Sequence, residues 1–235
     1  MLGVKSITYK VKESTILENV TFEVPKNAIC GLLGQNGAGK STLIKLILGV
    51  LEPLSGSISI DGQQLNEFNR IEHLKKIGSL IEQASLYEHL TPLENLELAR
   101  RIYRVEKGYS EELLSSVGLD EKKKQKVKSL SLGMKQRLGL ALAMIGKPEL
   151  VILDEPTNGL DPDGLNDLKN LIIRFNKEKG ATFLISSHHL TELEKVATHV
   201  VVLHRGVSTQ AIEINRMDSD DLNSIYFKLT KAHYQ

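Results

Sequence analysis

Two stretches near the start of the chain, residues 4–9 and 16–24, alternate apolar and polar side chains, and the segment "KVKES" lies between them. A period of two is typical of strands that bury one face, so we expect two strands joined by a turn. The segment "SGSISIDG" predicts a short strand bounded by turn residues. Four apolar runs predict further strands: "NAICGLLG", "LVILDE", "ATFLISS" and "VVVLHRG".

Helical periodicity separates these strands. "TLIKLILGVL" is apolar nearly all round and predicts a buried helix. Residues 91–103 predict a helix with Thr91 as N-cap, Pro92 at its first position and Glu94 completing a capping box, and "SEELLSSVGL" predicts a short one. A longer helix ends at Gly180, and one of its faces carries Leu165, Leu168, Ile172 and Phe175.

Strands that alternate with helices predict an α/β fold with a mostly parallel sheet. The stretch from about residue 88 to 145 reads instead as a small helical lobe. We therefore expect a single domain over residues 1–206 with this lobe inserted, followed by a tail, residues 207–235, that is weakly structured or helical.

The composition is that of an ordinary globular protein, with 41% hydrophobic and 25% charged residues and a formal net charge of +1. This balance gives no electrostatic attraction to nucleic acid or to an anionic membrane, and we expect no nucleic-acid partner. The first ten residues lack the apolar core of a signal peptide, and the longest apolar stretch, "LGLALAMIG", is too short to cross a bilayer. Work at a membrane would require another subunit.

Cys30 is the only cysteine, so no internal disulfide can form. This usage suits a reducing compartment. The residue lies in the apolar run "AICGLLG", and we expect a packed core side chain rather than a reactive thiol.

The segment "GQNGAGKST", residues 34–42, follows a predicted strand and opens a predicted helix, as a phosphate-binding P-loop requires. Its glycines let the backbone curl so that amide groups point at phosphate oxygens, and the helix N-terminus adds a favourable dipole. Lys40 would contact the β- and γ-phosphates, and Ser41 would offer a hydroxyl to Mg²⁺. The predicted ATP-binding set is Gly34, Gln35, Asn36, Gly37, Ala38, Gly39, Lys40, Ser41 and Thr42.

A second motif, "LVILDEP", places two carboxylates at the end of a predicted buried strand. Asp154 can hold Mg²⁺ through water, and Glu155 stands where a general base could polarise an attacking water. Adjacent carboxylates at a strand end are often only a turn, but buried carboxylates are costly without a cation. Beside a P-loop they indicate a P-loop NTPase core.

"LSLGMKQRLGLALA", residues 130–143, gives the chain its resemblance to the ATP-binding cassette (ABC) ATPases, over roughly residues 4–206. The family signature is usually Leu-Ser-Gly-Gly-Gln. Ser131 and Gly133 keep this pattern, whereas Leu132 and Met134 depart from it, as in members that export peptides and antibiotics. The resemblance implies an N-terminal antiparallel β subdomain and an inserted helical subdomain.

The resemblance also implies that two copies share their ATP sites. Ser131, with Gly133 and Met134, would cap the ATP held on the P-loop of the second copy. "TNGLDP" is similar to the family's D-loop, which places Asp161 at the interface. "SSHHLTELE" is similar to the switch segment, in which His188 is the catalytic histidine.

Two contacts follow from alignment with the family. The residue stacked on adenine falls on Val11, which is not aromatic, so either Tyr9 stacks on the base or Val11 makes an apolar contact, and we favour Tyr9. The frame "IGSLIEQASLYEHLT" places Glu82, not Gln83, where the family has a glutamine near the metal and γ-phosphate. A glutamate there resembles the ATPase subunits of lantibiotic self-protection transporters.

These features predict an enzyme that hydrolyses ATP with Mg²⁺, as the ATP-binding subunit of a transporter that exports a lantibiotic or a similar antimicrobial peptide. The expected partners are a second copy and separate transmembrane permease subunits, with the protein on the cytoplasmic face of the membrane. One alternative is a drug or small-antibiotic exporter. A soluble non-transport ABC ATPase is another, although such members usually carry two cassettes or long coiled coils. The signature segment and Glu155 disfavour a GTP-binding switch protein.

Overall fold

The computed structural model describes residues 1–82 and 84–214. The chain divides into two compact units. The terminal unit comprises residues 1–70 and those from 184 onward, and the central unit comprises residues 71–183. Gln83 and most of the predicted tail, residues 215–235, lie outside the described residues. The assignment of residues 1–206 to one domain stays a prediction.

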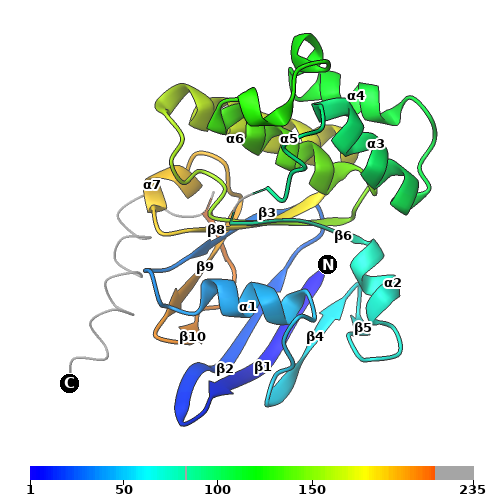
Figure 1. Ribbon diagram of the computed structural model, residues 1–235. Helices are drawn as coiled ribbons and strands as arrows, with labels where there is room; N and C mark the ends of the chain where they lie inside the picture. Colours follow the sequence, from blue (N-terminus) through cyan, green and yellow to red (C-terminus); the bar gives the residue numbers. More distant parts are fainter. Residues whose placement is uncertain (83, 215–235) are drawn as a thin grey trace. The chain divides into compact units, whose positions relative to one another are not determined.

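The terminal unit begins with an antiparallel sheet in the order β2-β1-β4-β5 (Figure 1). Its strands are β1 (Leu2–Val11), β2 (Ser14–Val24), β4 (Ser55–Ile60) and β5 (Gln63–Gln64). The predicted pair of strands at the start of the chain is confirmed, but its alternation is interrupted. Ser6 has a left-handed φ of 51°, and the register shifts between Val4 and Ile7, so that both apolar side chains are buried although they lie three residues apart.

A second sheet in this unit positions the P-loop. Its strands are β3 (Ile29–Leu33), β9 (His199–His204), β10 (Val207–Ser208) and β11 (Ile212–Glu213), and the helices α1 (Lys40–Ile47) and α7 (Leu190–Leu193) belong to the same unit. β3 pairs in parallel with β9, and all five of its residues are buried. The strand order here is β10-β9-β3-β8, in which β8 (Thr182–Ser187) crosses the boundary between the units.

Cys30 lies within β3 and is completely buried, which confirms the predicted core position. Desolvation raises the pKa of its thiol to about 12. The thiol is therefore neutral throughout the physiological range.

The central unit joins two parallel strands to a group of helices. Its elements are α2 (Arg70–Lys75), β6 (Ile77–Ile81), α3 (Pro92–Tyr103), α4 (Tyr109–Ser116), α5 (Leu132–Met144), β7 (Leu150–Asp154) and α6 (Pro162–Lys179). The strand order is β8-β7-β6, and β6 and β7 are parallel. Helices α3, α4 and α5 pack against one another where the sequence predicts a helical lobe (Figure 1).

Local signals set the helix ends as predicted. The Thr91 hydroxyl accepts a hydrogen bond from the Glu94 amide (3.2 Å), and the Glu94 carboxylate accepts one from the Thr91 amide (2.7 Å), which completes the capping box of α3. Helix α6 ends at Gly180, whose φ of 67° is left-handed. Leu168, Ile172 and Phe175 on α6 are buried, and Leu165 is half-buried.

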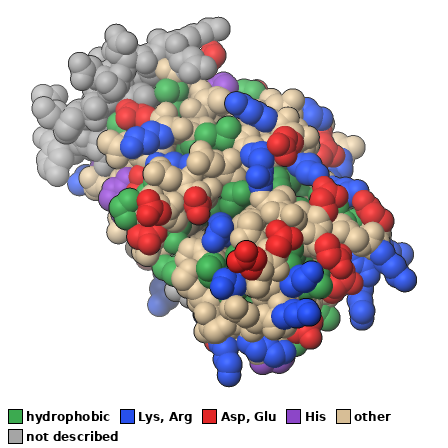
Figure 2. All heavy atoms as spheres, turned by 90° about the horizontal axis from the view of Figure 1, so that it is seen from above, with side chains coloured by type: hydrophobic (Ala, Val, Ile, Leu, Met, Phe, Trp, Pro, Cys, Tyr) green, Lys and Arg blue, Asp and Glu red, His purple; other side chains and the backbone are tan. Residues whose placement is uncertain are grey.

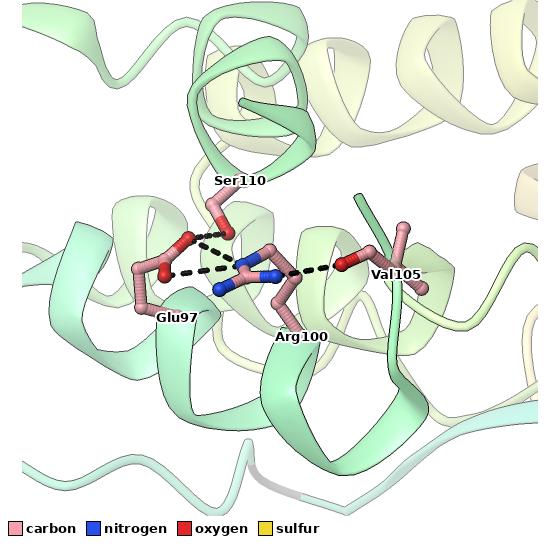
Figure 3. Close-up of polar contacts among 4 residues, drawn as sticks. All are labelled: Glu97, Arg100, Val105 and Ser110. Atoms are coloured by element: carbon pink, nitrogen blue, oxygen red, sulfur yellow. Dashed lines mark hydrogen bonds and ion pairs between the residues drawn. The ribbon is translucent and has the colours of Figure 1, made fainter. Parts of the chain in front are cut away.

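A polar cluster joins α3 to α4 (Figure 3). Arg100 Nε donates to both carboxylate oxygens of Glu97 (2.9 and 3.1 Å), and its Nη1 donates to the Val105 carbonyl (2.6 Å). The Ser110 hydroxyl donates to the same carboxylate (2.6 Å). The hydrogen bonds from Arg100 and then Ser110 lower the pKa of Glu97, so this carboxylate stays ionised and its contacts persist at neutral pH.

The face of the molecule in Figure 2 carries basic and acidic side chains in a mixed pattern. Neither sign of charge forms a continuous field on this face, in line with the formal net charge of +1. Electrostatic steering of a strongly charged partner would require such a field.

Candidate functional site

The P-loop lies between β3 and α1 in the terminal unit and is fixed at two points. The Gly34 amide donates to the Ser187 carbonyl (3.2 Å), and the Ala38 carbonyl accepts from the Gly206 amide (3.1 Å). Gly39 is the N-cap of α1, so the loop leads directly into the helix N-terminus. The first amides of a helix lack intrahelical partners, which makes this end suitable for an anion.

Three glycines in the loop serve different purposes. A β-carbon on Gly34 would lie 2.5 Å from the Leu203 carbonyl oxygen, and one on Gly39 would lie 2.7 Å from Leu17 Cδ2. Gly37, with a φ of 81°, has no atom within 4 Å of the position that a β-carbon would take. The loop is thus packed on its inner side and open at Gly37, and this shape fits a phosphate chain.

Lys40 carries the positive charge of this loop. Its side chain is buried, and Nζ donates to the carbonyls of Gly34 (2.7 Å) and Gln35 (3.3 Å), which holds the ammonium across the loop. Ser41 and Thr42 follow in the first turn of α1 and are half-buried. The donor set is a cation, a helix N-terminus and hydroxyls, which matches the chemistry of a nucleoside triphosphate.

His188 follows the residue that binds the P-loop backbone. Ser187 accepts from Gly34 through its carbonyl, and its hydroxyl accepts from the His189 amide (3.0 Å). The His188 ring is half-buried and lies against the His189 ring, with centroids 3.8 Å apart. The hydrogen bond between Gly34 and Ser187 therefore places His188 one residue away from a direct contact with the P-loop.

Glu82 and Glu155 occupy equivalent places at the edge of the central unit's strands. Ile81 of β6 pairs with Asp154 of β7, so each glutamate directly follows one of two neighbouring parallel strands. Their φ values of 55° and 47° are both left-handed, an uncommon conformation for residues other than glycine that is enriched at functional sites. Asp154 is buried, Glu155 is half-buried and Glu82 is exposed.

Ser131 and Asp161 are both helix N-caps, and they line one hollow of about 340 Å³ in the central unit. The Ser131 hydroxyl accepts from the Met134 amide (3.3 Å) at the start of α5, and Asp161 Oδ1 accepts from the Gly164 amide (2.8 Å) at the start of α6. Gly133 and Met134 line the same hollow. The structure therefore brings together the four residues that the sequence predicts at the dimer interface.

Tyr9 and Val11 lie at the end of β1, and the predicted adenine contact of Tyr9 stays a prediction. Tyr9 is half-buried, and Val11 is 48% exposed. Gln35 and Asn36 are exposed in the P-loop, and Ala38 is buried.

Comparison with known proteins decides the family. The profile described as ABC transporter matches residues 17–158 of this chain. The chain belongs to the ABC transporter family. It is 42% identical to the lantibiotic transport ATP-binding protein SrtF of Streptococcus pyogenes over 206 residues, which cover 88% of each chain. It is 40% identical to the bacitracin transport ATP-binding protein BcrA of Bacillus licheniformis over 215 residues, which cover 91% of this chain and 70% of BcrA.

Solved structures of ABC ATPases agree in fold. One, an ATP-binding subunit of an ABC transporter, has a TM-score of 0.84 at 33% identity and covers 98% of this chain and 99% of its own. Another is a dimeric ATP-binding cassette in a post-hydrolysis state with ADP and Pi, with a TM-score of 0.79 at 26% identity, covering 91% and 99%. The predicted P-loop fold and ATPase activity are confirmed, and this ABC protein is an ATP-binding subunit. No helix within the described residues is long and apolar enough to span a membrane.

The sequence did not reveal the backbone partners that hold the P-loop of this ABC ATPase. Gly206 donates to Ala38 and accepts from the Glu18 amide (2.8 Å), and a β-carbon on it would lie 2.4 Å from the Ile16 carbonyl oxygen. The one available signal was a glycine directly after the strand "VVVLHR". Gly206 therefore supports the nucleotide loop from a distance of more than 160 positions in the chain.

Replacing Gly39 with alanine should weaken ATP binding at least about tenfold, because a left-handed L-residue costs about 1–2 kcal/mol and a clash with Leu17 is added. Gly62→Ala is the matched control, since Gly62 has a φ of 75° and no atom within 4 Å of its β-carbon position. Calorimetric titration with ATP measures both affinities. Equal affinities in the two variants would contradict the role of close packing at Gly39.

Proposed function

We propose that this protein drives the export of a lantibiotic or a similar antimicrobial peptide and thereby protects the producing cell. The observation that carries the proposal is the 42% identity to a lantibiotic transport ATP-binding protein over 88% of both chains. Glu82 at the position where the family usually has glutamine supports the same subgroup. The 40% identity to a bacitracin transport protein favours a second candidate, export of a small peptide antibiotic of another kind.

The roles proposed for the site residues follow from their chemistry. The P-loop amides and Lys40 bind the phosphates, and Glu155 takes a proton from the attacking water. His188 steadies the γ-phosphate as charge develops on it. The left-handed conformation of Glu155 turns the backbone at the end of β7, and the Asn158 amide stabilises this turn by donating to the Glu155 carbonyl (3.2 Å).

Ser41, Asp154 and Glu82 are the residues proposed to hold Mg²⁺, which would neutralise the phosphate charge. All three offer oxygen atoms, the ligands that this hard cation prefers. Within the described residues, no three or more His, Cys, Asp or Glu side chains form a metal site by themselves. Magnesium in phosphate-handling enzymes is usually held by one or two carboxylates together with substrate phosphates, and the donor set fits that pattern.

Two copies are proposed to form the working unit, each closing on the ATP of the other. The hollow shared by Ser131 and Asp161 supports this arrangement, because the N-terminus of α5 lies at it and has no acidic residue in its first turn, which favours an anion there. Similarity to dimeric cassettes supports it as well.

The second proposed partner is a set of transmembrane permease subunits. These subunits would hold the protein at the cytoplasmic face of the membrane. The central unit has a groove of about 630 Å³ lined by Ile71, Leu74, Ile102 and Tyr103 among others. Ile71 and Ile102 are 70% and 79% exposed. Apolar side chains gathered at a groove are typical of a protein–protein contact, and an apolar helix of a permease would bury them.

Glu155→Gln should retain ATP binding but lower kcat at least about 100-fold, because the amide cannot accept the proton. Phosphate release measures turnover, and peptide tolerance of cells with the permease subunits measures export. Glu149→Gln, next to the other end of β7, is the control and should keep both activities. Normal turnover by Glu155→Gln would remove this residue from the role. Normal peptide tolerance with no turnover would contradict ATP-driven export.

Glu82→Gln should make ATP binding less dependent on Mg²⁺. Two unit charges ~4 Å apart repel by about 4 kcal/mol at an effective dielectric constant near 20, so a carboxylate beside the γ-phosphate needs the cation. ATP affinities with and without Mg²⁺ give the ratio, which should fall in Glu82→Gln and stay unchanged in Gln83→Ala. Loss of ATPase activity in the Gln83 variant alone would show that the motif is shifted by one residue.

Ile102→Glu should prevent co-purification with the permease subunits, because it places a charge in an apolar interface. The ATPase activity of the isolated subunit should not change. Leu54→Glu is the matched control, since Leu54 is 67% exposed and does not line the groove. Full co-purification of Ile102→Glu would exclude this groove as the docking surface.

A further inference from the structure

Leu132 is an apolar side chain in an unusual place. It is the first residue of α5, directly after the N-cap Ser131, and 42% of it is exposed. It also stands where the family signature usually has glycine. A large apolar residue next to a predicted phosphate contact requires an explanation from its neighbours.

Those neighbours form a reciprocal contact between two motifs. Leu132 Cδ2 lies over Gly159, where a β-carbon would come within 3.1 Å of it. Leu160 Cδ2 lies over Gly133, at 3.9 Å from the corresponding position. Each leucine thus packs on a glycine of the other segment, which links the signature turn to the loop after β7.

The loop after β7 is short and braced by its own hydrogen bonds. The Asn158 amide donates to the Glu155 carbonyl (3.2 Å), and the Leu160 amide donates to the Thr157 carbonyl (3.2 Å). Gly159, with a φ of 77°, is only four residues after Glu155. The segment that Leu132 contacts is therefore joined by four residues and two hydrogen bonds to the proposed base.

Leu132 also lines a second hollow, of about 250 Å³. This hollow is bounded by residues 84–86 and by Glu88, which pairs with Lys135 of α5 (2.6 Å). These residues follow Glu82 in the chain. Leu132 is therefore in contact with the loop after β7, which follows the proposed base Glu155, and borders the segment after β6, which follows the proposed metal ligand Glu82.

We propose that Leu132 is a positioning residue that couples the signature turn to Glu155, so that capping one ATP adjusts the base acting on the other. The inference rests on the proposed composite sites. An exposed side chain adds little to folding stability, but the contact with Gly159 fixes where Glu155 lies. Loss of the side chain should therefore affect turnover more than folding or ATP affinity.

Leu132→Ala keeps the helix propensity of this position and removes the contact. We expect kcat to fall about tenfold, as for a slightly misplaced catalytic group, with KM changed less than about twofold, and the Hill coefficient for ATP to move toward 1. Leu132→Met should restore both values, since methionine conserves the volume. Leu98→Ala is the control, because Leu98 on α3 is 40% exposed and lines neither hollow.

Further measurements distinguish a role of Leu132 in turnover from a role in dimer assembly or in ATP binding. In a Glu155→Gln background, Leu132→Ala should still form the ATP-held dimer on size exclusion, and loss of that dimer would show a role in assembly and overturn the proposal. Unchanged kcat and Hill coefficient in Leu132→Ala, or a raised KM with unchanged kcat, would also overturn it. These results would leave the proposed function intact, which instead depends on the inactivity of Glu155→Gln.

Discussion

Parallel pairing of short, buried strands is the constraint on which the chemistry depends. Every residue of β3 and of β7 is buried, so a shift in register would move polar residues into the core. The pairing of Ile81 with Asp154 is therefore fixed, and it determines that Glu82 and Glu155 leave the sheet side by side. In the terminal unit, the carboxyl end of β3 leads into the P-loop, and that of β8 leads to His188.

Much of the fold could be predicted because its signals are local. The capping box of Thr91 and Glu94 and the left-handed Gly180 involve residues a few positions apart, and both were found from the sequence. Strand β6 was not predicted, since Gly78 and Ser79 interrupt its apolar pattern. A β-carbon on Gly78 would come 2.0 Å from the Ala143 carbonyl oxygen, so this glycine is required by the approach of α5, which lies some sixty positions away in the sequence.

The candidate site likewise combines residues that local motifs predict with contacts between distant segments that they do not. The P-loop, Asp154 and Glu155 could be proposed as site residues because each motif is continuous, whereas the bonds from Ser187 and Gly206 to the P-loop join distant segments. The contact between Leu132 and Gly159 could not be predicted for the same reason. The functions assigned to Glu82, His188 and Asp161 stay predictions, and so does the adenine contact of Tyr9 or Val11, because each is defined by atoms outside this chain.

The burial of Cys30 has a practical consequence. A thiol that is enclosed on every side and protonated at neutral pH reacts with alkylating reagents only when the fold opens. The folded subunit should therefore not react with maleimides, and Cys30 does not need to be replaced before labelling. A single new cysteine placed on the surface would carry a fluorophore without background, and the slow labelling of Cys30 itself would report the rate at which the sheet exposes its centre.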